Sequence, residues 1–286
     1  MSNIIASPAD RVLEPTTSPL GRFARRVAWG GVALALLGLF AWWMTPYQPA
    51  DADFLNRLAP PGSRNWFGTD QLGRDIATRL LYGVFWSLAL SVMIASTGLI
   101  VGTALGLIAV RAGRLGDFAL MRTTDSFFAF PELVAAVAFA GLFGPSTTNL
   151  VIALSLVSWM KFTRLTRSLA HGLDQQGFVI QARLNGLSSA LVLWRHILPN
   201  IVPSLLVLWT NSWSRTILSV SGLSFLGFGV QPPTAELGAM LLDGKPYMQT
   251  APHVMIFPGL AVLICVLTIN LLGDRLRDLV ADQDAR

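Results

Sequence analysis

Residues Phe178 to Asn200 read FVIQARLNGLSSALVLWRHILPN. This polar, arginine-bearing segment lies between two strongly apolar stretches, 150–160 and 201–222. Because lipid offers no hydrogen-bonding partner to polar and charged groups, such a segment cannot lie in the hydrocarbon of a bilayer. We therefore expect it on the cytoplasmic surface of a membrane protein, where a partner can reach it.

The composition of the whole chain supports a membrane protein. Of its 286 residues, 53% are hydrophobic and only 13% are charged, whereas soluble domains carry about 25% charged residues. The net charge of +5 does not indicate nucleic-acid binding, because the basic residues flank apolar spans, as they do on cytoplasmic membrane faces. Three histidines and one cysteine, Cys265, leave little for a metal or redox site.

Six stretches are apolar enough to cross a bilayer, which needs about 20 such residues in a helix. The fourth is the shortest and leads directly into Lys161, Arg164 and Arg167. The sequence therefore predicts an all-α, polytopic protein with about six transmembrane helices: Val27–Thr45, Phe85–Val110, Phe118–Phe143, Leu150–Met160, Ile201–Gly222 and Met255–Leu272.

Basic residues cluster before the first span and after the second, fourth and last spans. The positive-inside rule then places both termini in the cytoplasm. The predicted organisation is a flexible cytoplasmic tail, a first transmembrane helix, an extracytoplasmic loop, a transmembrane core that contains segment 174–200, and a C-terminal tail. These parts cover residues 1–20, 21–45, 46–80, 81–280 and 281–286.

Within the central segment, Phe178–Asn185 is expected to form a short helix. Gly186 suits the left-handed position after a helix end. Ser188 or Ser189 can cap a second helix that runs to His196, and Pro199 discourages its continuation. The apolar side chains of this element fit either a groove on another protein or the lipid interface, and the residues alone leave both open. We expect this apolar face to comprise Phe178, Val179, Ala182, Leu187, Leu191 and Trp194.

The segment resembles the loop that permease subunits of bacterial ATP-binding-cassette importers present to their ATPases, written EAA-x3-G-x9-I-x-LP. The positions that match at the required spacing are Ala182, Gly186, Leu198 and Pro199. The positions that differ are Ile180, where the motif has glutamate, Gln181, where it has alanine, and His196, where it has isoleucine.

Two further stretches strengthen the resemblance. Residues 66–83, WFGTDQLGRDIATRLLYG, resemble the GTD-x-LGRD-x-x-SR-x-x-YG signature of the dipeptide, oligopeptide and nickel group of these importers. Residues 223–243, LSFLGFGVQPPTAELGAMLLD, and 257–278, FPGLAVLICVLTINLLGDRLRD, resemble the closing part of the same group. The chain is most similar to the second of the two permeases in such systems.

The resemblance implies a fold of the type I importer permease kind, in the bacterial cytoplasmic (inner) membrane, that does no covalent chemistry. It implies a heterodimer with a sister permease, two ATPase subunits that bind ATP and magnesium, and an extracytoplasmic solute-binding protein. The chain itself is expected to hold no cofactor and no metal. It has no Walker A sequence, because Gly238 lies one residue too far from Gly244-Lys245 and Pro246 occupies the Ser/Thr position.

The resemblance also assigns two groups of site residues. ATPase coupling is expected from Phe178, Ala182, Arg183, Gly186, Leu198 and Pro199, although a glycine that merely ends a helix would explain Gly186 as well. The extracytoplasmic loop signature comprises Gly68, Thr69, Asp70, Gly73, Arg74 and Asp75. A compact turn in which Asp70 accepts backbone N–H groups and Arg74 pairs with an acidic neighbour is favoured over direct contact with the binding protein.

Polar residues inside spans suggest a translocation path. A charge at mid-bilayer costs about 2.5–3.5 kcal/mol on insertion scales and usually faces protein or water. Glu132, Asn211 and Arg215 are therefore candidates to line the path, or Glu132 and Arg215 to pair across helices. In the second span, the spacing of Gly98, Gly102 and Gly106 favours close helix packing.

Short peptides are the expected cargo, and a nickel or metal-chelate cargo is the alternative within the same family. His171 and His253 are isolated from other metal-ligating side chains, which argues weakly against bare metal. A self-contained secondary transporter is a further alternative, disfavoured because no inverted repeat is visible. Dependence of uptake on ATP or on the proton gradient separates these classes.

Overall fold

The computed structural model describes residues 48–284, with side-chain surroundings as far as Asp278. The predicted N-terminal tail, the first predicted transmembrane helix (21–45) and the last two residues lie outside this range. The described part is built from helices, and its single ladder contact is an isolated bridge between Thr69 and Asp75. The all-α prediction is confirmed.

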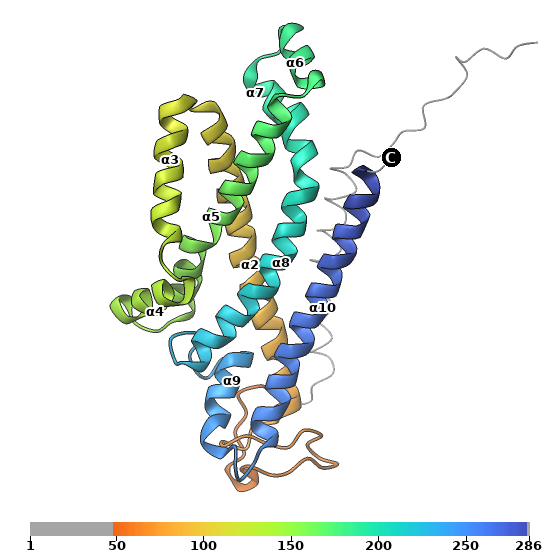
Figure 1. The fold of residues 1–286 in the computed structure, drawn as a ribbon. Helices are drawn as coiled ribbons and strands as arrows, with labels where there is room; N and C mark the ends of the chain where they lie inside the picture. The colour runs from red at the N-terminus through yellow and green to blue at the C-terminus, as the bar shows by residue number, and fades with distance from the viewer. Residues whose placement is uncertain (1–47, 285–286) are drawn as a thin grey trace, which may run out of the picture.

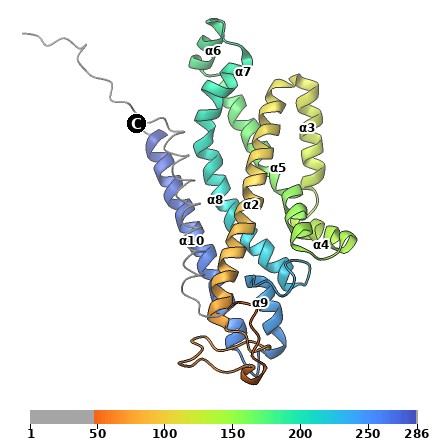
Figure 2. The ribbon, with the colours of Figure 1, turned by 180° about the vertical axis from the view of Figure 1, so that it is seen from behind.

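Among residues 48–284, three helices are long and apolar enough to cross a membrane: α2 (Ile76–Arg111), α10 (His253–Asp284), and α8 (Leu198–Phe225) together with the turns before it. They run side by side along the long axis of the molecule (Figures 1 and 2). They correspond to the second, fifth and sixth predicted spans. The fourth predicted span falls within α5 (Thr147–Asp174), which packs along α2 but becomes charged in its second half.

The third predicted span, 118–143, is wrong as a single helix. The chain forms α3 (Gly113–Phe128) and α4 (Glu132–Phe143), whose axes are bent by 79°. The break lies at Ala129–Pro131. Proline has no N–H for the helix ladder and disfavours helical geometry in the residue before it, so α3 ends before Pro131 and α4 begins after it.

The predicted close packing of the second span is confirmed, and its partner is α5. A Cβ atom added to Gly98 would lie 2.4 Å from the Ser158 hydroxyl, and one added to Gly102 would lie 2.3 Å from the Trp159 carbonyl oxygen. These distances are too short for any side chain, so only glycine lets the two backbones approach this closely.

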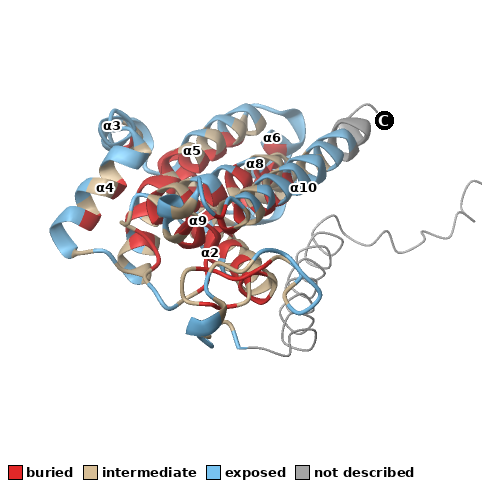
Figure 3. Ribbon diagram, turned by 90° about the horizontal axis from the view of Figure 1, so that it is seen from below, coloured by how far each residue is buried: buried red, intermediate tan, exposed pale blue. Residues whose placement is uncertain are grey.

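The two ends of the bundle differ (Figures 1 and 2). One end carries α6 (Gly177–Leu184) and α7 (Ser189–Val192); the other carries α9 (Leu237–Gly244), two short 3₁₀ turns (Phe54–Asn56 and Lys245–Tyr247) and the rest of the loop that precedes α2. In the view from below, buried residues gather where α2, α5, α8 and α9 meet, whereas α3 and much of α10 are exposed (Figure 3).

Candidate functional site

The tip of the molecule is shaped by the end of α6. Gly186 follows this helix with φ +83°, as predicted for a left-handed turn. Its N–H donates to the Arg183 carbonyl (2.9 Å), and the Leu187 N–H donates to the Ala182 carbonyl (3.3 Å). These two bonds are those of a Schellman motif. Ser188 then caps α7 by accepting a hydrogen bond from the Leu191 N–H.

The apolar residues of the tip divide into two groups, so the prediction of one apolar face is wrong. Val179 and Ala182 are buried against α5 and α8. A second group faces outward: Phe178, Ile180, Leu184, Leu191 and Trp194. The reason is the turn at Gly186, which folds α7 back so that only one side of each short helix meets the bundle. Arg183 is exposed and pairs with Asp174.

The prediction that Pro199 stops the second tip helix is also wrong. The chain passes from α7 through a π-helical turn, Leu193–Ile197, directly into α8. The Leu198 N–H donates to the Leu193 carbonyl, five residues back. Pro199 has no N–H to donate, and the π-helical turn directly before it shifts the hydrogen-bond register, so the helix continues through the proline.

At the opposite end, a buried charge network holds the loop before α2. Arg74 Nε donates to Asp70 Oδ2 (2.6 Å), and Arg79 Nε lies 3.4 Å from the same oxygen. Both guanidinium groups also approach Asp243 on α9, at 3.3 and 3.8 Å. Asp70, Arg74 and Arg79 are each less than 5% exposed. The predicted Arg74–acid pair is therefore present, but Arg79 and Asp243, absent from the predicted site, complete it.

The remaining signature residues form the turn itself. Gly68 and Gly73 have φ +79° and +77°, and a Cβ atom on Gly73 would lie 1.8 Å from the Asp53 carbonyl oxygen. Thr69 Oγ1 accepts from the Ala59 N–H. Asp75 caps α2 by accepting from the Thr78 N–H at 2.7 Å.

Asp53 itself is anchored at the edge of this turn. The Asn56 side-chain amide donates to its carboxylate at 2.6 Å. This bond lowers the pKa of Asp53 below its ordinary value.

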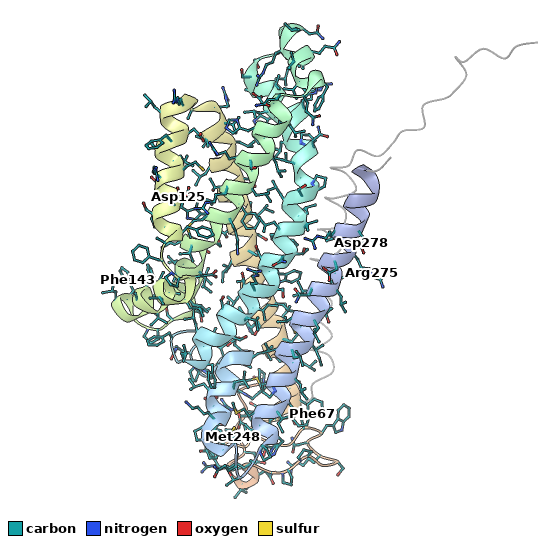
Figure 4. The ribbon with its side chains drawn as sticks, in the orientation of Figure 1. Phe67, Asp125, Phe143, Met248, Arg275 and Asp278 are labelled. Carbon is teal, nitrogen blue, oxygen red and sulfur yellow. The ribbon has the colours of Figure 1, made fainter. Side chains whose placement is uncertain are left out.

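Figure 4 shows Phe67, from the same loop, at the end of the molecule that also bears Met248.

Glu236, at the start of α9, is a buried carboxyl that the sequence reading missed. It is 0% exposed. Its Oε1 accepts from Ser87 on α2 (2.8 Å) and from Ser221 on α8 (3.4 Å), and its Oε2 accepts from the Ala239 N–H (2.9 Å). The signal available in the sequence was an acidic residue directly before an apolar helix, where a carboxylate can accept the free N–H groups of the first turn.

Two of the three candidate path residues lie on one exposed face of α8. Asn211 and Arg215, one helical turn apart, are exposed. Glu132, on α4, is half-buried and accepts a hydrogen bond from Ser219 on α8 (3.5 Å). Within residues 48–278, Glu132 forms no ion pair with Arg215. The half-buried Lys161 on α5 lies within electrostatic reach of both.

Arg215 and Asn211 belong to a polar pocket of about 380 Å³ between α8 and α10. Within residues 48–278, neither of these two side chains forms a hydrogen bond with another side chain. The lining from the two helices is Val207, Thr210, Asn211, Ser214, Arg215, Leu218, Val266, Asn270, Gly273, Asp274 and Arg277.

Residues 98–283 match the family described as "Binding-protein-dependent transport system inner membrane component". The chain belongs to this family. It is a multi-pass inner-membrane permease subunit of an ATP-binding-cassette importer, a non-catalytic component that works with separate ATPase subunits and a binding protein.

Proteins of similar sequence align with most of this permease. The nickel transport system permease protein NikC of Escherichia coli (strain K12) is 41% identical over 249 residues, 86% of this chain and 88% of NikC. The dipeptide transport system permease protein DppC of Alkalihalophilus pseudofirmus is 39% identical over 243 residues, 85% of this chain and 80% of DppC. The glutathione transport system permease protein GsiD of Escherichia coli O157:H7 is 42% identical over 248 residues, 86% of this chain and 82% of GsiD.

Solved structures confirm the type I permease fold. The permease resembles a chain of the MetNI methionine ABC transporter in an inward-facing conformation, with a TM-score of 0.56 at 18% identity over 70% of this chain and 95% of that one. It also resembles a chain of an amino acid ABC transporter with histidines, with a TM-score of 0.57 at 18% identity over 69% and 92%.

Proposed function

We propose that this permease pairs with a sister permease and forms half of a translocation pore for short peptides. Two ATPase subunits that bind ATP and magnesium dock at the α6–α7 end, and a solute-binding protein docks at the α9 end. Both chain termini then lie in the cytoplasm. This orientation is supported by arginines near the α6–α7 end, among them Arg111, Arg183 and Arg195, which follow the positive-inside rule.

The observation that carries the proposal is the continuous helical path from the tip to the pore face. From Ser189 to Phe225 the chain is helical without a break. The exposed tip residue Trp194 and the exposed path residues Asn211 and Arg215 therefore lie on one rigid element. Movement of the tip by closing ATPases would be transmitted along this helix to the pore, as in the shifts of rigid elements that underlie other switching transitions.

The exposed apolar tip residues suit a groove on a soluble partner. An apolar helix face that lies in a groove is a common recognition mode, and here Gly186 fixes the angle between the two short helices that present it. We assign ATPase coupling to Phe178, Ala182, Arg183, Gly186, Leu198 and Pro199. Of these, Ala182 acts from within, because its side chain is buried and supports the exposed ones.

The loop signature is proposed to support the outer face rather than to bind the solute-binding protein. Thr69, Asp70 and Arg74 are buried, and their polar atoms are engaged inside the loop. A buried ion pair that loses one partner leaves an uncompensated charge, so the network holds α9 against α2 in one position. The exposed side chains at the α9 end then make the contact with the solute-binding protein.

Peptide cargo is favoured by the donor chemistry of the chain. No group of three His, Cys, Asp or Glu side chains that could hold a metal lies within residues 48–278. Relatives of comparable identity are named for nickel, dipeptide and glutathione transport. Nickel, as a chelate, is therefore the second candidate cargo, with NikC as its support.

Uptake of labelled dipeptide and labelled nickel, in cells with and without the gene and with and without ATP depletion, tests the proposal. ATP-dependent dipeptide uptake that disappears with the gene is expected. Loss of nickel uptake alone would assign the chain to the metal branch. Gene-dependent uptake that persists without ATP would overturn the importer function.

A further inference from the structure

The pocket between α8 and α10 places charges of opposite sign at two heights. Thr210 on α8 and Gly273 on α10 lie at the same height, because a Cβ atom on Gly273 would lie 2.9 Å from Thr210 Oγ1. Heights along the two helices are therefore counted from this pair. The two helices run antiparallel (Figures 1 and 2). Arg215 is five residues from Thr210 toward the α9 end, about 7.5 Å along the helix, and Asp274 is about 1.5 Å from Gly273 in the opposite direction.

The backbones of the two charged residues are separated by about 9 Å in height, about 2 Å more than an extended dipeptide spans, and the long Arg215 side chain can close this difference. Two residues span about 7 Å from the amino to the carboxyl end. The side chains of Arg215 and Asp274 line the same pocket, and Asn211 and Asn270 line it between them. The amides provide donors and acceptors suited to a peptide bond.

The charge balance of the pocket disfavours a bare cation. Arg215 and Arg277 oppose the single carboxylate of Asp274, and the lining contains no histidine or cysteine. A guanidinium group forms two parallel hydrogen bonds to a carboxylate, which makes arginine the natural partner of that group. Charged residues in membrane spans are costly and mark substrate pathways when they face a cavity.

We propose that this pocket is a transit site for zwitterionic peptides. Arg215 binds the terminal carboxylate, Asp274 binds the terminal ammonium group, and the two asparagines bind the peptide bond. The inference rests on the proposed function, since it names the chemical class of cargo that the pore passes. It also accommodates short peptides of varied sequence, because only the backbone termini are recognised.

Peptide termini and pocket residues can be varied together in the complete importer, reconstituted in proteoliposomes with its sister permease, ATPases and binding protein. The probes are labelled alanyl-alanine and its C-terminal amide. Arg215→Gln is expected to lower the acid-to-amide uptake ratio about tenfold relative to wild type, as expected for loss of a charged hydrogen bond. The preference of the binding protein cancels, because it is the same in both samples.

Arg275→Gln is the matched control, since Arg275 is exposed on α10 but does not line the pocket (Figure 4). It should leave the ratio unchanged, and Arg215→Lys should restore part of it. Asp274→Asn should reduce discrimination between free and N-acetylated alanyl-alanine in the same way. An acid-to-amide ratio for Arg215→Gln equal to that of wild type would overturn the assignment.

A binding measurement separates failure of the site from failure of the proposed function. In the complete importer with Cys265→Ser and Val266→Cys, which leaves every proposed peptide ligand in place, a charged maleimide labels the pocket. Alanyl-alanine is expected to slow the labelling, and its amide is expected to have little effect. If wild type transports neither peptide, the proposed function fails, and equal labelling with and without alanyl-alanine then overturns the site as well.

Discussion

Ser87 on α2 donates a hydrogen bond of 2.8 Å to Glu236 at the start of α9, 149 residues away in the chain. The same hydroxyl oxygen accepts from the Leu237 N–H at 3.2 Å. Both side chains are fully buried. The pair therefore joins a long span to the short helix α9, and it supplies one of the three hydrogen bonds that the buried Glu236 carboxyl group accepts.

Replacement of this serine, Ser87→Ala, should destabilise the permease by about 1–3 kcal/mol, because it removes the donor to Glu236 and the acceptor for Leu237. The midpoint of thermal unfolding of the purified importer measures the effect. Ser63→Ala, at an exposed position of the loop before α2, is the control and should leave the midpoint unchanged. Equal midpoints for the two variants would contradict the role of the pair.

Arg79→Leu should cost about 3 kcal/mol or more, because it leaves the carboxylates of Asp70 and Asp243 with one cation fewer in a buried site. The amount of intact importer that survives a heat challenge measures the loss. Arg64→Leu removes an exposed arginine from the preceding loop and should behave as wild type. A heat-stable Arg79→Leu importer would show that Arg74 alone neutralises the site.

Gly102→Ala should disrupt the packing of α2 on α5, since the added methyl group would lie 2.3 Å from a backbone oxygen. Relaxation of two packed helices is costly, and overpacking typically destabilises by about 1–3 kcal/mol. Gly141→Ala, on α4, adds its methyl group where no atom lies within 4 Å. Comparison of the two variants by protein yield and thermal unfolding decides whether the close approach matters.

Gly186→Asp should uncouple transport by about tenfold or more while leaving the bundle folded, because an added Cβ atom has no atom of the described chain within 4 Å and the new charge would meet only a docked ATPase. Dipeptide uptake and copurification of the ATPases measure the effect. Gly186→Asn keeps a residue that tolerates left-handed geometry without the charge and should retain most uptake. Normal uptake by Gly186→Asp would mean that the glycine merely ends a helix.

The α6–α7 tip shows which structural features the local sequence predicts. Gly186 and Ser188 were placed correctly because a left-handed turn and a helix cap depend on neighbouring backbone groups. The effect of Pro199 was predicted wrongly, since whether a helix stops at a proline depends on the hydrogen-bond pattern of the turn before it. Here a π-helical turn, Leu193–Ile197, joins the two helices, and its formation depends on packing against α5.

The charge network of Asp70, Arg74, Arg79 and Asp243 illustrates the opposite case. The sequence placed Asp70 and Arg74 in one compact turn, because they are four residues apart. Arg79 and Asp243 could not be added from the sequence, since Asp243 is 169 residues from Arg74. Likewise, the hypothesis of a Glu132–Arg215 pair rested on charge alone, and the helix faces place Glu132 beside Ser219 instead.

The sequence by itself determined the membrane class, the helical content, the family and the local turns. Each of these follows from composition, hydropathy and short-range backbone chemistry. Only the tertiary structure decided which buried charges meet, where the third span breaks in direction, and which polar side chains share the α8–α10 pocket. The physical reason is that these relationships depend on the relative rotation and height of packed helices, which side-chain contacts across the whole chain fix together.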